Sequence, residues 1–305
     1  APTASIKTVT VKLKITFNID GTIVESNSTI NVKLDKQNPW IENGSIKYSN
    51  DTPTADGRKV TFNLSDGAGS GIKEYALVET PTCSSVTDWV AAQDGMQTIY
   101  LWNGTYYICV RDRAGNFNTD ENLTNPSNII TVQNVDNIAP TITLNGGSDE
   151  WVGSSYLSWT GSDVGSGVYI YQYSFDNTNW VSTEETSLTI DYQYNGYFYV
   201  KVMDKVGNWS EVKYVQVKVD TTKPSQSFSI GSSTAGSNSW YKALSVKATL
   251  SDAASKPASV KYCITTSSTC TPGTAGTISS NVVTVPLGSN ASAQKVCFQT
   301  TDNAG

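Results

Sequence analysis

The sequence predicts an all-β protein made of tandem two-sheet sandwich modules, and three observations lead to this prediction. The same series of short motifs recurs along the 305 residues in the same order each time. Each copy contains short runs of strand-forming residues, separated by turn residues at the spacing typical of β-sandwiches. No segment shows a helical period over three turns, so long helices are not expected.

Three motifs define the repeat. Asp-x-x-x-Pro opens each copy, Ser-Asp followed by a turn of small residues comes next, and Asp-x-x-Gly or Asp-x-Ala-Gly follows an aromatic or apolar strand. The aspartates that mark them are Asp35, Asp66 and Asp112 in the first copy, Asp136, Asp163 and Asp204 in the second, and Asp220, Asp252 and Asp302 in the third. Successive copies start 101 and 84 residues apart, which fits one seven-stranded immunoglobulin-like sandwich per copy.

The repeats place the domain boundaries. We expect immunoglobulin-like modules at 38–137, 138–221 and 222–305, with the third truncated before its last strand. In residues 1–37, apolar and polar residues alternate on both sides of an Asp-Gly turn, a pattern that predicts a β-hairpin. Its length matches the last hairpin of the middle copy, so we interpret residues 1–37 as the final β-hairpin of a truncated preceding repeat.

The motif series resembles the tandem bacterial immunoglobulin-like repeats of Gram-positive cell-surface proteins. It consists of Asp-x-x-x-Pro, Ser-Asp-x-Gly-Ser-Gly, Asn-Gly-x-Tyr-Tyr and a following Asp-x-x-Gly-Asn, and it covers residues 35–305. This resemblance implies a secreted protein at the cell surface or in the cell wall, which acts as a stalk or adhesin segment. It implies no catalytic residues.

Composition restricts the remaining functions. The chain has no histidine, which removes the usual general base and the commonest transition-metal ligand. Its net charge of -6 argues against a nucleic-acid partner, and no apolar run is long enough for a membrane span. We therefore expect a protein that is not an enzyme and has no obligatory cofactor. Its partners would be neighbouring repeats of the same chain and an unidentified surface ligand, either a glycan or a protein.

An alternative function remains open, in which the repeats are accessory carbohydrate-binding modules of a larger secreted hydrolase. Trp89 and Trp180 each follow the third predicted strand of a module. Stacked aromatic rings can bind sugars, but a large ring that covers one end of a sandwich core is a second explanation.

The repeated aspartates are candidate calcium ligands. In an immunoglobulin-like topology, the incoming linker and two of the loops lie at the same end of a module, so the three aspartates of each copy should converge. Carboxylates and loop carbonyls supply the oxygen ligands that Ca²⁺ prefers. The candidate sets are Asp136, Asp163 and Asp204, then Asp35, Asp66 and Asp112, and last Asp220, Asp252 and Asp302, whose middle turn has lost its glycines. The alternative is that aspartate is present only because it forms turns.

The five cysteines predict two disulfides. Cys83 and Cys270 each lie eight residues after a tyrosine, and Cys109 and Cys297 each lie late on a later strand. The middle copy lacks both positions, so we expect Cys83–Cys109 and Cys270–Cys297, each worth roughly 3–4 kcal/mol by loop closure. Cys263 is left over and could compete for Cys297. Buried free thiols are the alternative, whereas the Cys-x-x-Cys spacing of a zinc site is absent.

Overall fold

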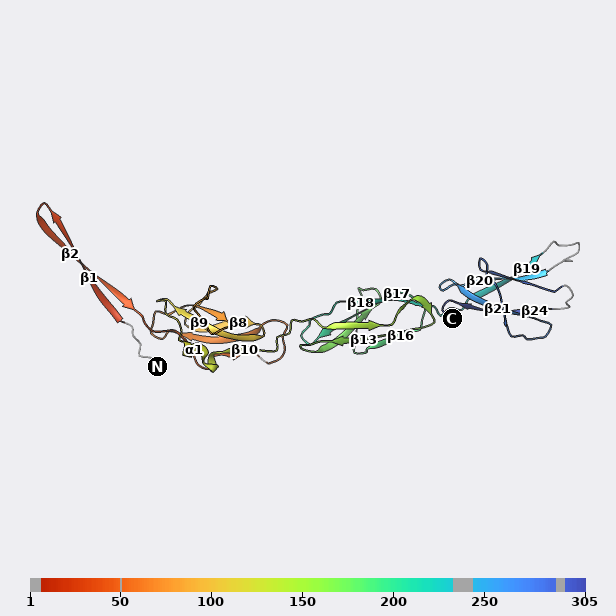
Figure 1. Cartoon of the computed structure of the whole chain (residues 1–305), viewed down its shortest axis with the longest axis horizontal. Helices are drawn as coiled ribbons and strands as arrows, with labels where there is room; N and C mark the ends of the chain where they lie inside the picture. The colour runs from red at the N-terminus through yellow and green to blue at the C-terminus, as the bar shows by residue number, and fades with distance from the viewer. Residues whose placement is uncertain (1–6, 50, 233–243, 289–293) are drawn as a thin grey trace. The chain divides into compact units, whose positions relative to one another are not determined.

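The computed structural model describes residues 7–49, 51–232, 244–288 and 294–305, which are almost entirely strands and connecting loops (Figure 1). Within these residues the helices are α1 (Asp120–Thr124) and one 3-10 turn, η1 (Pro126–Asn128). The predicted all-β class is therefore confirmed. Backbone contacts divide the chain into two compact units, Ala1–Ile138 with Lys205–Asn208, and Ala139–Asp204 with Trp209–Gly305.

The first unit begins with a long β-hairpin, while residues 1–6 of the predicted 1–37 segment lie outside the described part. Strands β1 (Lys7–Ile19) and β2 (Thr22–Leu34) pair antiparallel along their whole length. The turn residues Asp20 and Gly21 both have positive φ, as a two-residue hairpin turn requires. Apolar partners such as Val11 opposite Ile30 share one face, and they are exposed. The assignment of this hairpin to a preceding repeat stays a prediction.

The rest of the first unit is a two-sheet sandwich. One sheet contains β3 (Trp40–Ile41), β4 (Lys47–Tyr48), β5 (Arg58–Ser65) and β8 (Gly95–Leu101). The other contains β10 (Ile130–Val132), β9 (Gly104–Asp112), β6 (Ile72–Val78) and β7 (Val90–Ala91). Val60, Phe62 and Leu64 alternate along β5 and point into the core, where they pack with Ile108 and Val110 of β9.

The second unit contains two separate hydrophobic cores. Around the first core, one sheet holds β11 (Thr141–Asn145), β13 (Ser155–Ser162) and β16 (Ser187–Ile190). The facing sheet holds β12 (Ser148–Val152), β18 (Lys213–Val219), β17 (Tyr194–Asp204), β14 (Val168–Ser174) and β15 (Val181–Thr183), and β12 pairs with β18 in parallel. Leu157, Trp159 and Phe198 are the large side chains at the centre of this core.

The second core of this unit is smaller and lies between two three-stranded sheets. These are β19 (Ser225–Ser232), β20 (Leu244–Ser251) and β23 (Val282–Pro286) on one side, and β22 (Thr274–Ala275), β21 (Pro257–Thr265) and β24 (Lys295–Asp302) on the other. Its buried members are Ala248, Leu250, Val260, Val283 and Val285. The three cores correspond to the three predicted repeats, whereas the predicted module boundaries themselves stay predictions.

The same strand ends carry the repeated aspartates. Strands β9, β17 and β24 end at Asp112, Asp204 and Asp302, and the strands β5, β13 and β20 end one residue before the aspartate of the second motif. Each of these aspartates is therefore held by a strand of its own sandwich, which fixes where its carboxylate can lie.

The core of the second sandwich provides a test of the fold. Trp159 is buried among aromatic rings, with its ring centroid 5.5 Å from that of Phe198. We expect Trp159→Ala to lower the free energy of unfolding of this sandwich by about 3–5 kcal/mol, because it leaves a large cavity. Tyr156→Ala, on the same strand but 63% exposed, is the matched control. Urea denaturation would contradict the assignment if both variants unfolded at the same concentration.

Candidate metal centre

The first set of predicted ligands converges within the first unit. Asp35 lies in the linker after β2, Asp66 follows β5, and Asp112 ends β9. Each offers a carboxylate oxygen, and these oxygens all lie within 4.8 Å of one another. Residues from three distant parts of the sequence therefore meet at one end of the sandwich, as the topology argument predicted.

Asp66 is the central carboxylate of this set and is fully buried. Its Oδ2 accepts a hydrogen bond from the Gly71 backbone N–H at 2.8 Å, while its Oδ1 is buried without a hydrogen-bond partner among the described residues. Burial raises the pKa of Asp66 to about 6; the Gly71 N–H opposes this shift, and the neighbouring carboxylates of Asp35, Asp112 and Asp94 add to it. The protein thus holds a carboxylate whose ionised form needs another partner.

The turn around Asp66 leaves no room for a side chain at Gly69. A Cβ added there would lie 2.2 Å from Asp66 Oδ2, far inside van der Waals contact. Gly71 adopts φ +87°, which places its N–H toward the carboxylate in a conformation that residues with a Cβ rarely adopt. The glycines of the second motif are therefore explained by how closely the backbone wraps the carboxylate.

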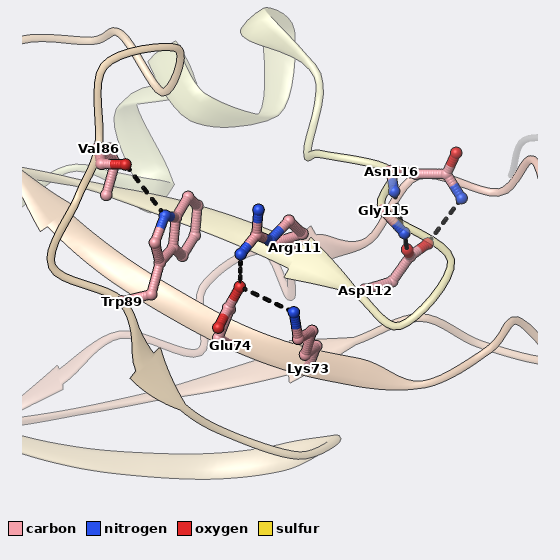
Figure 2. Close-up of polar contacts among 8 residues, drawn as sticks. All are labelled: Lys73, Glu74, Val86, Trp89, Arg111, Asp112, Gly115 and Asn116. Carbon is pink, nitrogen blue, oxygen red and sulfur yellow. Dashed lines mark hydrogen bonds and ion pairs between the residues drawn. The ribbon is translucent and has the colours of Figure 1, made fainter.

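Asp112 is fixed by the turn that follows β9, which Figure 2 shows in detail. Its Oδ1 accepts hydrogen bonds from the backbone N–H groups of Gly115 and Asn116 at 2.7 and 2.8 Å, and its Oδ2 accepts one from Asn116 Nδ2 at 2.7 Å. Asn116 Nδ2 also donates to the backbone carbonyl of Asp35 at 3.3 Å. The asparagine of the third motif therefore joins this turn to the linker.

Asp35 joins the linker to the other loop. Its Oδ1 accepts a hydrogen bond from the Gln37 N–H at 2.8 Å, and its Oδ2 accepts one from the Ser70 N–H at 2.5 Å. Partial burial raises its pKa, but the hydrogen bonds from Gln37 and Ser70 outweigh burial and bring the pKa below its ordinary value. Asp35 is thus ionised at neutral pH and contributes a full negative charge to the cluster.

The third set has the same construction in the second unit. The carboxylate oxygens of Asp220, Asp252 and Asp302 lie within 4.8 Å of one another. Asp252 Oδ1 accepts hydrogen bonds from the Ala254 and Lys256 N–H groups at 2.9 and 3.1 Å, and its Oδ2 is buried with no partner in the described part of the chain. The loss of glycines was expected to weaken this set, but Lys256 takes φ +68° and presents its N–H to Asp252 as Gly71 does to Asp66.

The second predicted set is divided between the two units. Asp163 and Asp204 belong to the second unit, where their carboxylate oxygens lie within 4.8 Å of each other. Asp163 Oδ2 accepts hydrogen bonds from the Gly165 and Gly167 N–H groups at 3.1 and 2.6 Å, and no described residue donates to its buried Oδ1. Asp136 belongs to the first unit, where its Oδ1 accepts a hydrogen bond from the Ile138 N–H at 3.1 Å.

The donor chemistry of these sets fits a hard divalent cation. Every converging ligand atom is a carboxylate oxygen, and backbone carbonyls lie in the same loops, which suits Ca²⁺ better than zinc or copper. Turn formation explains the carboxylate oxygens that accept N–H groups. It does not explain why Asp66, Asp163 and Asp252 each bury one oxygen without a partner among the described residues, which is costly for an ionised group.

The cysteines confirm one predicted disulfide and correct the other. Cys83 is bonded to Cys109, as predicted. The predicted Cys270–Cys297 bond is wrong, because Cys270 is bonded to Cys263 and Cys297 is free. After β21 the chain reverses and pairs Thr274 with Tyr262, which brings Cys270 back beside Cys263.

The error arose from a register difference between the modules. Tyr75 lies opposite Val110, two residues before Asp112, whereas Tyr262 lies opposite Phe298, four residues before Asp302. The two tyrosines that were used to align the cysteines are therefore not equivalent. A count from the strand start, rather than from tyrosine, would have shown the two-residue difference.

Two polar residues near the first set were not anticipated from the sequence. Asp94 accepts hydrogen bonds from the N–H groups of Asp66 and Ile72, at 2.7 and 3.2 Å, and so fixes the start of the Asp66 turn. Asn116 bridges Asp112 and the linker, as described above. Asn116 belongs to a repeated motif and could have been found from that signal, whereas Asp94 has no counterpart in the other motifs.

Trp89 packs against a small cluster separate from the main core of the first sandwich, so it does not cover an end of that core, as one of its two explanations had it. Its ring packs on the small cluster of Ala76, Cys109 and Leu123, and its Nε1 donates to the Val86 carbonyl at 3.2 Å. The guanidinium of Arg111 lies over the ring at 4.8 Å and also pairs with Glu74 (Figure 2). In the second unit, Lys201 Nζ lies 4.2 Å from the ring centroid of Trp180.

No protein-family model matches the sequence, and no curated protein matches it. Similar solved structures include the Clostridium thermocellum CbhA fibronectin(III)-like modules, at 11% identity over 57% of this chain and 93% of that chain, with a TM-score of 0.26. Three consecutive domains of titin match at 12% identity over 88% and 94%, with a TM-score of 0.34. A tetra-tandem repeat in the extending region of a large adhesion protein matches at 16% identity over 98% and 82%, with a TM-score of 0.28.

The described strands form sandwiches of mainly antiparallel sheets in tandem, as expected for immunoglobulin-like repeats. In the part of the chain that the structure describes, no helix has the length and apolar character needed to cross a membrane.

The raised pKa of Asp66 predicts a pH dependence of stability. The folded protein binds a proton at Asp66 up to pH of about 6, whereas the unfolded chain releases it near pH 4, so metal-free stability falls as pH rises from about 4 to 6. Two pKa units correspond to roughly 3 kcal/mol. We expect Asp66→Asn to remove this fall and to be more stable than the unmodified chain at pH 7.5 in chelator.

The measurement is urea denaturation of the first unit at several pH values, with Asp88→Asn at an exposed position as the matched control. Asp35 does not cancel the fall in stability between pH 4 and 6, because its pKa is lowered and its own contribution to the pH dependence of stability lies at more acidic pH. Equal pH profiles for Asp66→Asn and the unmodified chain would show that Asp66 is ionised normally.

Proposed function

We propose that the chain is a non-catalytic segment of an extracellular, cell-surface array, which acts as a stalk or adhesin segment and holds calcium where a linker meets the next sandwich. The tandem immunoglobulin-like sandwiches support the array, and the carboxylate sets support the metal. The observation that carries the proposal is the buried oxygen of Asp66, unpartnered among the described residues, beside the carboxylates of Asp35 and Asp112.

The mechanism follows from the position of the linker residue in each set. Asp35 is the member of the first set that lies outside the sandwich strands and their loops, and Asp220 has the same place in the third set. Three carboxylates within 4.8 Å repel one another, and a divalent cation among them would replace repulsion with attraction. Bound calcium would therefore restrain the linker against the loops of the sandwich that follows it.

Hydrogen bonds already prepare the linker for this role. The carbonyl of Asp35 accepts from Asn116 and its carboxylate accepts from Ser70, so both loops contact the same linker residue. In the third set, Asp220 Oδ2 accepts from the Ser255 N–H at 2.9 Å. Burial raises the pKa of Asp220, but hydrogen bonds from Ser255 and Thr222 bring it below its ordinary value. The linker carboxylates of Asp35 and Asp220 are therefore ionised at neutral pH, as calcium ligands must be.

The alternative function, accessory carbohydrate-binding modules of a larger secreted hydrolase, is favoured by a separate observation. Tyr197, Tyr199 and Tyr214 form an aromatic group on the outward face of β17 and β18, with ring centroids 5.6 to 6.3 Å apart. Tyr214 is 62% exposed, so its ring is free to stack on a sugar. Glycan-array binding that is lost in Tyr214→Ala would favour this alternative over the stalk.

Calcium should raise the melting temperature of the chain. At millimolar concentrations and the affinity of extracellular calcium modules, stabilisation of about 1–2 kcal/mol by mass action corresponds to a rise of roughly 5–15 °C. We expect this rise, measured by calorimetry, to be lost for the first sandwich in Asp66→Asn and kept in Asp88→Asn. Magnesium at the same concentration controls for ionic strength and for selectivity.

The two arms separate the cost of the ionised carboxylate from its use as a ligand. Asp66→Asn should be more stable than the unmodified chain in chelator by up to roughly 3 kcal/mol, and millimolar calcium should narrow this difference by about 1–2 kcal/mol, because only the unmodified chain gains stability from the ion at this site. The proposed calcium site would be wrong if the unmodified chain had the same melting temperature in chelator and in millimolar calcium. The proposed restraint on the linker would be wrong if small-angle scattering also showed no change with calcium.

A further inference from the structure

The last sandwich contains three cysteines in one cluster. The Sγ atoms of Cys263, Cys270 and Cys297 all lie within 4.8 Å of one another, and all three residues are partly exposed. Cys263 and Cys270 form the disulfide, and Cys297 carries the thiol. Cys297 lies directly opposite Cys263 in the antiparallel pair of β21 and β24. A free thiol is thus held beside a disulfide that it can attack.

We infer that this cluster is a thiol–disulfide exchange site, in which one disulfide moves among three sulfur atoms. The Cys297 thiolate attacks Cys263 Sγ, a Cys263–Cys297 bond forms, and the Cys263–Cys270 bond breaks. The electron pair of the broken bond leaves on Cys270, which takes up the proton that Cys297 lost. The number of disulfides is unchanged, so the step needs no oxidant and no reductant.

The backbone accommodates both linkages without rearrangement of the sheet. Directly opposed residues of antiparallel strands have Cα atoms about 4.5–5.5 Å apart, within the range that disulfides span. The Cys263–Cys297 bond would therefore join two strands that are already hydrogen-bonded neighbours. The existing Cys263–Cys270 bond spans a Cα–Cα distance of 6.3 Å and closes the loop after β21.

The exchange changes which part of the surface carries the thiol. With Cys263–Cys270 formed, the thiol is on strand β24; with Cys263–Cys297 formed, it is on Cys270, which follows the exposed residues 266–269 of its loop. That loop then stays attached through the pairing of Thr274 with Tyr262. The site would thus present a reactive thiol on a surface loop, where a disulfide of a second molecule can reach it.

The first sandwich supplies an internal control. Its disulfide, Cys83–Cys109, joins the equivalent loop to strand β9, and among the described residues no third cysteine clusters with it. Exchange should therefore be confined to the last sandwich of the same molecule. This inference rests on the cysteine geometry alone and does not depend on the stalk, adhesin or calcium proposals.

The test uses the full chain, purified without reductant and incubated at pH 8. The native protein is alkylated with N-ethylmaleimide, brought to acid pH to stop exchange, and digested with pepsin for non-reducing peptide mapping. We expect both Cys263–Cys270 and Cys263–Cys297 peptides, with the label divided between Cys297 and Cys270. The Cys297→Ser variant should contain Cys263–Cys270 alone and take up no label in this sandwich.

A second variant tests the new linkage directly. In Cys270→Ser treated with glutathione disulfide, we expect Cys263–Cys297 to form, with the melting temperature of the sandwich retained. The inference would be wrong if the unmodified chain, after hours at pH 8, carried label in this sandwich on Cys297 alone and contained Cys263–Cys270 as the sole linkage there. Scrambling that also involves Cys83 or Cys109 would overturn it too, because it would indicate unfolding instead of exchange in the native site.

Discussion

The aspartate that directly follows β5, β13 or β20 buries one carboxylate oxygen in each sandwich, and this is the constraint on which the rest of the linker end depends. Asp66 is enclosed so tightly by its own turn that Gly69 cannot carry a side chain and Gly71 must take a left-handed conformation. The same turn presents the Ser70 N–H to Asp35, and so determines where the linker enters the sandwich. One buried aspartate therefore sets the loop, its glycines and the path of the incoming chain.

Opposing pKa shifts show how the charges of this end are balanced. Burial of Asp66 outweighs its single N–H donor and raises its pKa, whereas the two N–H donors to Asp35 outweigh partial burial and lower its pKa. Asp112 has three donors within 2.8 Å, from Gly115 and Asn116. Most of the carboxylate oxygens are thus neutralised by backbone and amide dipoles, and the uncompensated charge is concentrated on Asp66 Oδ1, which has no partner among the described residues.

The sequence was informative wherever the modules share their geometry. Repetition of the three aspartate motifs was sufficient to predict that Asp35, Asp66 and Asp112 converge, because the strand order of the fold dictates which loops share an end. Prediction from the sequence failed where the geometry differs between modules. The pairing of Cys270 depends on a two-residue register difference, which a count from the tyrosines missed, and on the reversal of the chain after β21, which residue spacing does not reveal. Lys256 similarly adopts a backbone conformation that its residue type did not predict.

Comparison of the three sandwiches suggests why their cysteines vary. The loop that follows β6, β14 or β21 is paired to that strand over only two or three residues, and each sandwich holds the loop by a different further contact. In the first, Cys83 is bonded to Cys109 of β9; in the second, Lys201 of β17 lies over the ring of Trp180; in the third, Cys270 is bonded to Cys263 of β21. Cys109 and Lys201 both lie three residues before the aspartate that ends their strand, so they occupy the same position. A covalent bond and a cation–π contact therefore serve one structural need, which is to hold an otherwise loosely paired loop against the sheet.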